Sequence, residues 1–326
     1  MAEAPDPVLE VRDLAVHFPM GGGLFGGPRR TVHAVDGVDL VLRKGECLGL
    51  VGESGCGKST LALSILGLQA PTRGTIRLAG EDLSSAAAGR KHRARVAQMV
   101  FQDPYSSLNP RQTVRRTLEA PLRLHGVTDK AEIEARIAGI MQHVGLRPEQ
   151  AARYPHEFSG GQRQRIGIAR ALILEPQLVV LDEPVSALDV SIRAQIINLL
   201  LDLKDRLGLS YLMISHDLGV VEHMSDRVAV MYLGRIVETG DWQTLFTAPR
   251  HPYTRALIGA IPDPFGGKLA VKMTGEVPNP LEPPSGCRFH PRCPEMRDLC
   301  RQPPTPPLEP IAPGHEVRCI RARELA

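Results

Sequence analysis

A glycine-rich run with one lysine is the first feature of this sequence that could do chemistry. It comprises Gly52, Glu53, Ser54, Gly55, Cys56, Gly57, Lys58, Ser59 and Thr60. Its glycines let successive backbone N–H groups point inward at an anion. Lys58 would bring a full positive charge to the β- and γ-phosphates, and the Ser59 hydroxyl is a ligand suited to Mg²⁺. The run therefore matches the P-loop pattern and predicts an ATP site.

Two adjacent carboxylates, Asp182 and Glu183, follow an apolar run at residues 178–181. An α/β sheet places its ligand chemistry at the C-terminal ends of its strands. We therefore expect Asp182 to hold Mg²⁺ and Glu183 to orient and polarise the attacking water. Taken alone, the pair could equally be two solvated carboxylates at a strand end. Together with the phosphate site, it predicts ATP hydrolysis.

Alternating strands and helices must position these residues. The apolar strand 46–52 runs directly into the glycine-rich turn, and a helix begins near Lys58. This order predicts an α/β core with a mostly parallel sheet. A hairpin is expected to turn at Gly234. Further helices are expected at 113–124, at 128–144 with Thr128 as its cap, at 161–174 with Ser159 as its cap, and at 190–207.

The run Phe158-Ser159-Gly160-Gly161-Gln162 resembles the signature motif of ABC-type ATPases, with Phe in place of the usual Leu. Other positions match the same family in the expected order, over about residues 8–245. They are Gln102 (Q-loop), Asp189 (D-loop) and His216 (switch histidine). Read singly, Ser159 could be only a helix cap, His216 a structural histidine and Gln102 a surface amide. The resemblance implies a P-loop NTPase (RecA-like) core with an antiparallel β-subdomain and a helical subdomain.

The resemblance also implies roles for these residues. Gln102 would contact Mg²⁺ and the attacking water, and His216 would contact the γ-phosphate. Ser159, Gly160, Gly161 and Gln162 would face the ATP bound by a partner subunit. The adenine ring needs an aromatic partner in the N-terminal region, where a Gly/Arg-rich insertion replaces the expected Tyr. Phe18 and Phe25 are the candidates.

The phosphate run, the stretch HPYTRAL at 251–257 and the tail sequence CRFHPRCP resemble ATP-binding subunits of oligopeptide and dipeptide importers. That resemblance implies a heterodimer with a sister ATPase, two membrane-spanning permease subunits and an extracytoplasmic solute-binding protein. The chain would then sit peripherally at the cytoplasmic face of the cell membrane. Nickel or another small solute is the alternative cargo. A soluble ABC ATPase acting on DNA or ribosomes, and a regulatory subunit without turnover, are the rival classes.

Composition excludes several other functions. The 326 residues are 43% apolar and 23% charged, and the net charge of +3 is too small to argue for nucleic acid. No run approaches the roughly 20 apolar residues of a membrane-spanning helix. The N-terminal residues lack the apolar segment of a secretory signal. We divide the chain into an ATP-binding domain, 1–261, with its helical subdomain at about 103–170, and a proline-rich extension, 262–326, called here the C-terminal extension.

Four of the six cysteines fall in the C-terminal extension. They are Cys287, Cys293, Cys300 and Cys319. Their spacing matches neither a ferredoxin run nor a standard zinc knuckle. Four thiolates in a segment with little apolar core would still suit a [4Fe–4S] cluster or a structural zinc, and unligated cysteines remain an alternative. The resemblance favours the iron–sulfur cluster. His290, between the first two cysteines, is expected to be a surface residue.

Overall fold

The computed structural model describes residues 6–21, 30–82, 89–261, 273 and 275–325. The chain folds into two compact units. The first consists of Met1–Leu9, Leu42–Glu46 and Arg77–Met213, and the second of Glu10–Val41, Cys47–Ile76 and Ile214–Ala326. Each unit therefore gathers segments that lie far apart in the sequence.

Parallel strands of the first unit lead to the carboxylate pair. Strand β7 (Leu178–Asp182) lies between β6 (Ala97–Val100) and β8 (Ser210–Ile214), and it pairs in parallel with β6. β8 is buried along its whole length and β7 over its first four residues. Such continuous apolar runs are typical of strands covered on both faces. The short β5 (Glu81–Asp82) pairs antiparallel with the end of β4 (Arg73–Leu78).

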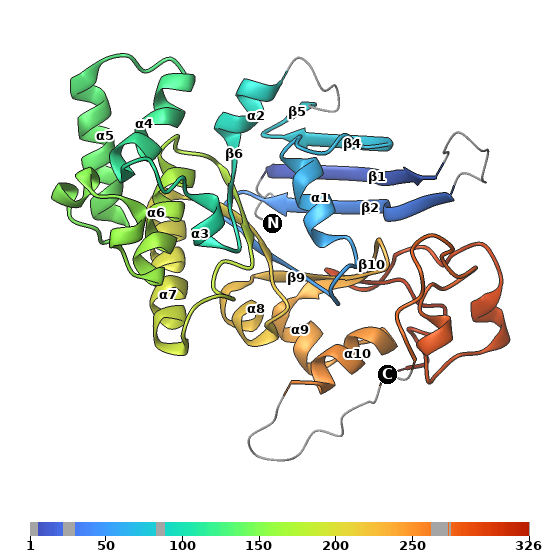
Figure 1. Ribbon diagram of the computed structural model, residues 1–326. Helices are drawn as coiled ribbons and strands as arrows, with labels where there is room; N and C mark the ends of the chain where they lie inside the picture. Colours follow the sequence, from blue (N-terminus) through green and yellow to red (C-terminus); the bar gives the residue numbers. More distant parts are fainter. Residues whose placement is uncertain (1–5, 22–29, 83–88, 262–272, 274, 326) are drawn as a thin grey trace. The chain divides into compact units, whose positions relative to one another are not determined.

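Three helices of the first unit, α4 (Val114–Leu124), α5 (Lys130–His143) and α6 (Gly160–Leu172), contact one another (Figure 1). Helix α4 begins after Thr113, close to the expected position. The expected cap of α5 is wrong by one residue. Asp129 caps this helix instead of Thr128, because its carboxylate accepts the Ala131 N–H at 3.1 Å. The remaining α-helices described in this unit are α2 (Arg90–Val96), α3 (Pro104–Ser107) and α7 (Val190–Leu207), with 3₁₀ turns at Pro148–Ala152 and Pro155–Glu157.

The second unit contains a five-strand segment in the order β11-β12-β10-β9-β3. Strand β3 (Cys47–Val51) pairs in parallel with β9 (Arg227–Tyr232). β9 and β10 (Arg235–Asp241) form the expected antiparallel hairpin, which turns at Gly234 with φ +80°. A second sheet places β2 (Arg30–Arg43) beside β1 (Pro7–Met20), with β4 on the other side of β1.

The C-terminal extension contains more regular structure than its proline-rich sequence indicates. Strands β11 (Glu309–Ala312) and β12 (His315–Val317) pair antiparallel, and β12 also pairs antiparallel with β10. The extension also has 3₁₀ turns at His290–Arg292 and Asp298–Arg301. The α-helices described in the second unit are α1 (Lys58–Ile65), α8 (Leu218–Met224), α9 (Trp242–Thr247) and α10 (Pro252–Gly259). No helix within the described ranges has the length and apolar content needed to cross a bilayer.

Candidate functional site

The glycine-rich run of the second unit forms the expected turn between strand β3 and helix α1. Two of its glycines are required by the backbone. A Cβ at Gly52 (φ +153°) would lie 2.1 Å from the Met231 carbonyl oxygen, and one at Gly57 (φ +111°) would lie 2.1 Å from that of Ala34. Gly57 caps α1 without any side-chain hydrogen bond. The first N–H groups of α1 are therefore not taken by a capping side chain, which suits them to bind an anion.

Lys58 places its charge inside the turn. The side chain is buried, and Nζ donates to the carbonyl oxygens of Gly52 at 2.7 Å and Glu53 at 3.0 Å. The thiol of Cys56 lies 3.7 Å from the same Nζ. Burial raises the pKa of Cys56, so this thiol stays neutral. The turn thus combines one fixed cation with a helix N-terminus, the arrangement that phosphate binding needs.

Glu53 has two partners that the sequence did not indicate. Its N–H donates to the Tyr253 hydroxyl at 2.8 Å, and its carboxylate accepts two hydrogen bonds from Arg292. Tyr253 lies in the HPYTRAL stretch and Arg292 in CRFHPRCP. Both stretches are marks of the importer group, but neither spacing nor periodicity connects them to the phosphate site.

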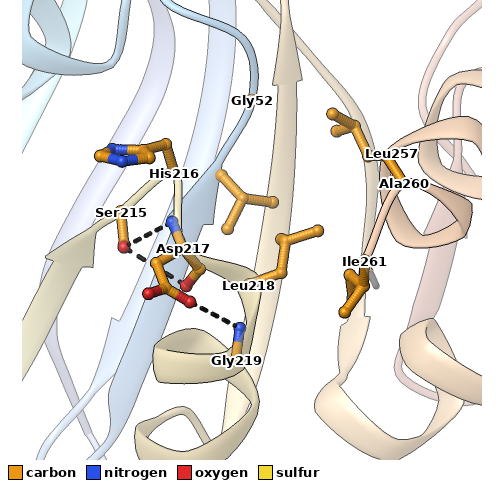
Figure 2. A pocket seen from close by; sticks show the side chains of 10 residues that line it. Gly52, Ser215, His216, Asp217, Leu218, Gly219, Leu257, Ala260 and Ile261 are labelled. Carbon is orange, nitrogen blue, oxygen red and sulfur yellow. Dashed lines mark hydrogen bonds between the residues drawn. The ribbon is translucent and has the colours of Figure 1, made fainter. Parts of the chain in front are cut away.

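His216 and Gly52 line one pocket of the second unit (Figure 2). His216 stands on the turn that leads from β8 into α8. The flanking residues fix that turn: the Asp217 N–H donates to Ser215 Oγ at 3.0 Å, and Asp217 Oδ1 accepts the Gly219 N–H at 3.1 Å. The pocket also has an apolar lining, made by Val51, Leu218, Leu257, Ala260 and Ile261. The structure therefore places the expected switch histidine and the first glycine of the phosphate run in the lining of the same pocket.

In the first unit, the structure brings Gln102 and Glu183 together. Gln102 Nε2 donates to Glu183 Oε2 at 2.7 Å. Glu183 has φ +46°, a left-handed conformation that is rare for a residue with a side chain. Strain of this kind is often found at functional positions. Asp182 is the last residue of β7, at the strand end where a ligand-binding carboxylate was expected.

Ser159 caps helix α6 as expected. Its Oγ accepts the Gln162 N–H at 3.4 Å, and its own N–H donates to Gln162 Oε1 at 3.1 Å, which completes a capping box. Gly161 lies against α7, where an added Cβ would be 2.5 Å from Ile192 Cγ2. Asp189 is the N-cap residue of α7. Phe158, at the position usually held by Leu, is buried.

The four cysteines of the C-terminal extension line one pocket, although their sequence spacing fits no standard motif. The Cys287 N–H donates to the Cys300 carbonyl oxygen at 2.8 Å. Burial, assisted by the neighbouring thiols, raises the pKa of Cys287 to about 12 and that of Cys293 to about 11. None of the four forms a disulfide. His290 is half-buried in the same pocket, with Nδ1 2.9 Å from the Cys287 carbonyl oxygen.

A second group of side chains with atoms that could bind a metal ion lies in the N-terminal part of the chain. One atom each from His17, His33 and Asp36 falls within 4.8 Å of the others. However, Asp36 also accepts hydrogen bonds from Arg235, at 2.9 Å, and from Arg288. Burial alone would raise the pKa of Asp36, but these two guanidinium groups keep it well below its usual range. The same two charges would repel a bound cation.

The aromatic partner for adenine stays a prediction. Phe18 lies in β1 and is half-buried. Phe25 falls outside the described residues. Of the residues expected in the ATP site, the second unit contains the phosphate run and His216, while Gln102, Asp182, Glu183 and the signature belong to the first unit.

Two protein families match this chain. The family described as ABC transporter matches residues 35–186, and the one described as oligopeptide/dipeptide transporter, C-terminal region, matches residues 237–300. The oligopeptide transport ATP-binding protein AppF of Bacillus subtilis is 48% identical over 320 residues, which covers 96% of this chain and 97% of that protein. The dipeptide transport ATP-binding protein DppF of Escherichia coli is 49% identical, with 92% and 91% covered.

Solved structures give the same fold. The structure of cbiO1 from Clostridium perfringens, part of an ABC transporter complex, has a TM-score of 0.64 at 27% identity and covers 74% of this chain and 92% of its own. A dimeric bacterial ABC transporter cassette has a TM-score of 0.63 at 26% identity, with 72% and 98% covered. These matches confirm the expected P-loop NTPase fold. The chain therefore belongs to the ABC transporter family, in the group of oligopeptide and dipeptide transport ATP-binding proteins, and it is an ATPase.

Proposed function

We propose that this chain is the ATP-hydrolysing subunit of an importer that takes up dipeptides or oligopeptides. The main support for a peptide cargo is the match of residues 237–300 to the C-terminal region of oligopeptide/dipeptide transporters. The ABC transporter match ends at residue 186, so this second match is separate from it and is the one that points to peptide cargo. The proposed boundary between the ATP-binding domain and the C-terminal extension remains at residue 261.

Hydrolysis in this proposal starts from a phosphate chain bound by the run 52–60. Lys58 and the N–H groups at the start of α1 hold the β- and γ-phosphates. The Glu183 carboxylate, kept in place by Gln102, accepts the proton of the attacking water. His216 donates a hydrogen bond to the γ-phosphate. When bound, Mg²⁺ neutralises phosphate charge, and Ser59, Gln102 and Asp182 would hold it.

The complete catalytic unit is proposed to be a dimer. Ser159, Gly160, Gly161 and Gln162 lie at the N-terminus of α6, where N–H groups favour an anion. In the proposal these residues, with Asp189, face the ATP of a sister ATPase in a heterodimer. A related cassette has been solved as a dimer in a post-hydrolysis state with ADP and Pi. Two permease subunits and an extracytoplasmic solute-binding protein would complete the importer, with this chain peripheral at the cytoplasmic face of the membrane.

The four cysteines are proposed to hold a [4Fe–4S] cluster. Four sulfur donors from separate turns line one pocket, which supports one ligand shared by all four. No three of these sulfurs lie mutually within 4.8 Å. Four thiolates bound to one zinc ion would be only about 3.8 Å apart, given Zn–S distances of about 2.3 Å. A bound cluster would supply thiolate–iron bonds that act as a structural clip.

Metal analysis of anaerobically purified protein tests the cysteine site. We expect about four irons and four acid-labile sulfides per chain, with absorbance near 400 nm. Cys300→Ser should remove most of the iron, because Cys300 is a donor in the pocket. Cys47→Ala, which alters a buried cysteine outside the pocket, should leave the iron content unchanged. Colourless protein with one zinc per chain would contradict the cluster.

Uptake by the assembled importer tests the proposed function. In cells that depend on this subunit, Glu183→Gln should lower uptake of a labelled dipeptide and ATP turnover together, by roughly a hundredfold or more. Glu175→Gln is the matched control, because Glu175 is exposed and is not one of the predicted site residues. Normal dipeptide uptake in cells without the subunit would contradict the cargo assignment. Wild-type turnover by Glu183→Gln would contradict the catalytic role.

A further inference from the structure

Arg292 of the C-terminal extension contacts Glu53 of the phosphate run. The Glu53 carboxylate accepts two hydrogen bonds from Arg292, from Nη1 to Oε2 at 2.6 Å and from Nη2 to Oε1 at 3.0 Å. The Glu53 N–H donates to the Tyr253 hydroxyl at 2.8 Å. A single residue of the phosphate run is thus held through both its backbone and its side chain.

The surroundings of Arg292 fix its direction. Its side chain is only 6% exposed, and the guanidinium carbon lies 5.9 Å from the centroid of the Tyr232 ring. The Tyr232 ring packs against Tyr253, at 4.6 Å between ring centroids, and against Phe289, at 5.2 Å. The hydrogen bonds to Glu53 raise the pKa of Arg292, so the guanidinium stays charged. A planar guanidinium held in this way can meet a carboxylate at two points, which an ammonium group cannot.

The charge of Glu53 gives this contact a consequence for ATP binding. A carboxylate in a turn that holds phosphates repels the ligand unless a nearby cation neutralises it. Because the Arg292 pair is bidentate and little exposed, solvent screens it less than an ordinary surface ion pair. The Glu53 carbonyl oxygen also accepts a hydrogen bond from Lys58 Nζ at 3.0 Å. A shift of Glu53 would therefore also displace a partner of the phosphate-binding lysine.

We propose that Arg292 is a positioning residue for ATP binding. It neutralises Glu53 and, together with Tyr253, holds the phosphate run in its binding conformation. Arg292 acts through Glu53 and touches no reacting atom, so it is not a catalytic residue. The inference concerns nucleotide affinity alone and goes beyond the proposed function. A wrong cargo assignment would leave it unaffected.

A charge-removal cycle tests this role. In the full chain, Arg292→Met should raise the Kd for MgATP roughly tenfold. In the assembled transporter it should raise KM by a similar factor, while kcat at saturating ATP stays within about twofold. Adding Glu53→Gln removes the unpaired carboxylate and should bring the Kd back to within about threefold of the wild type. Arg297→Met, which removes an exposed arginine of the same extension, is the matched control and should leave the Kd unchanged.

Two results would overturn the proposal. One is an Arg292→Met chain that has the wild-type melting temperature and the wild-type Kd for ATP. The other is a double variant that binds ATP as weakly as the single variant, since the repulsion would then not come from Glu53. If Arg292→Met does not fold, Arg292→Lys keeps the charge and loses the two-point contact. It should raise the Kd roughly threefold, and a wild-type Kd in that variant would also overturn the proposal.

Discussion

The phosphate run and the C-terminal extension, both in the second unit, are fixed by different kinds of contact. Residues 52–59 are held mainly through backbone geometry, with positive φ at three glycines and a helix that starts directly after them. The described part of the extension has only two short strands and relies on charged side chains. Arg288 contacts Asp36, and Arg292 contacts Glu53. Mutations in the run are therefore expected to change ligand affinity, whereas most mutations in the extension are expected to change stability.

The largest expected effect comes from the lysine of the phosphate run. Lys58→Met removes the fixed charge at the β- and γ-phosphates and should raise the Kd for MgATP at least about a hundredfold, or about 3 kcal/mol. The free energy of unfolding should change by less than about 1 kcal/mol, because the loss of the Nζ hydrogen bonds to Gly52 and Glu53 is offset by no longer burying a charge. Nucleotide titration and chemical denaturation measure the two quantities.

Lys44→Met is the matched control, because Lys44 is exposed and lies outside the phosphate run. It should alter neither the affinity nor the stability. A Lys58→Met chain with wild-type affinity for MgATP, or one that is strongly destabilised, would contradict the proposal that the phosphate run determines affinity and the extension determines stability.

The smaller expected effect concerns a buried carboxylate that joins β10 to the extension. Glu238 is fully buried and accepts hydrogen bonds from the N–H groups of Arg250, at 2.7 Å, and His251, at 2.9 Å, and lies 2.8 Å from His315 Nε2. Glu238→Gln turns one acceptor oxygen into a donor that faces another donor. It should lower the free energy of unfolding by about 2 kcal/mol.

Chemical denaturation measures this loss, and ATP titration of the folded protein should give the wild-type Kd. Glu309→Gln, at an exposed position of β11, is the control and should stay within about 0.5 kcal/mol of the wild type. If Glu238→Gln weakens ATP binding without lowering the free energy of unfolding, residues other than Arg292 must also link the extension to nucleotide affinity.

Local features of the fold and the site could be predicted from the sequence. The turn at residues 52–59, the capping box at Ser159 and the hairpin at Gly234 each depend on residue types within a few positions of one another. The hydrogen bond between Gln102 and Glu183 joins residues 81 positions apart. The family's motif order predicts that both residues act on the attacking water, but it does not predict this bond. Local sequence patterns therefore predict the individual turns, caps and hairpins. Family resemblance predicts which distant residues belong to one site.

The remaining features depend on contacts that no local pattern encodes. Tyr253 and Arg292 lie 200 and 239 positions from Glu53, so nothing near Glu53 in the sequence points to them. The predicted cap of α5 is wrong by one residue because Thr128 and Asp129 are both residue types that favour the N-cap position. The short strands of the extension were missed because prolines interrupt the alternation that identifies strands.

The pairing of β12 with β10 has a consequence for aggregation. Without the extension, β10 would present unpaired N–H and C=O groups along a mostly buried strand, and such an exposed edge is a template for pairing with another chain. The extension replaces this edge with β11, which is only four residues long and contains Pro310, a residue without an N–H to donate. A chain shortened before residue 309 would therefore be expected to self-associate through β10 and not to persist as a smaller monomeric ATPase.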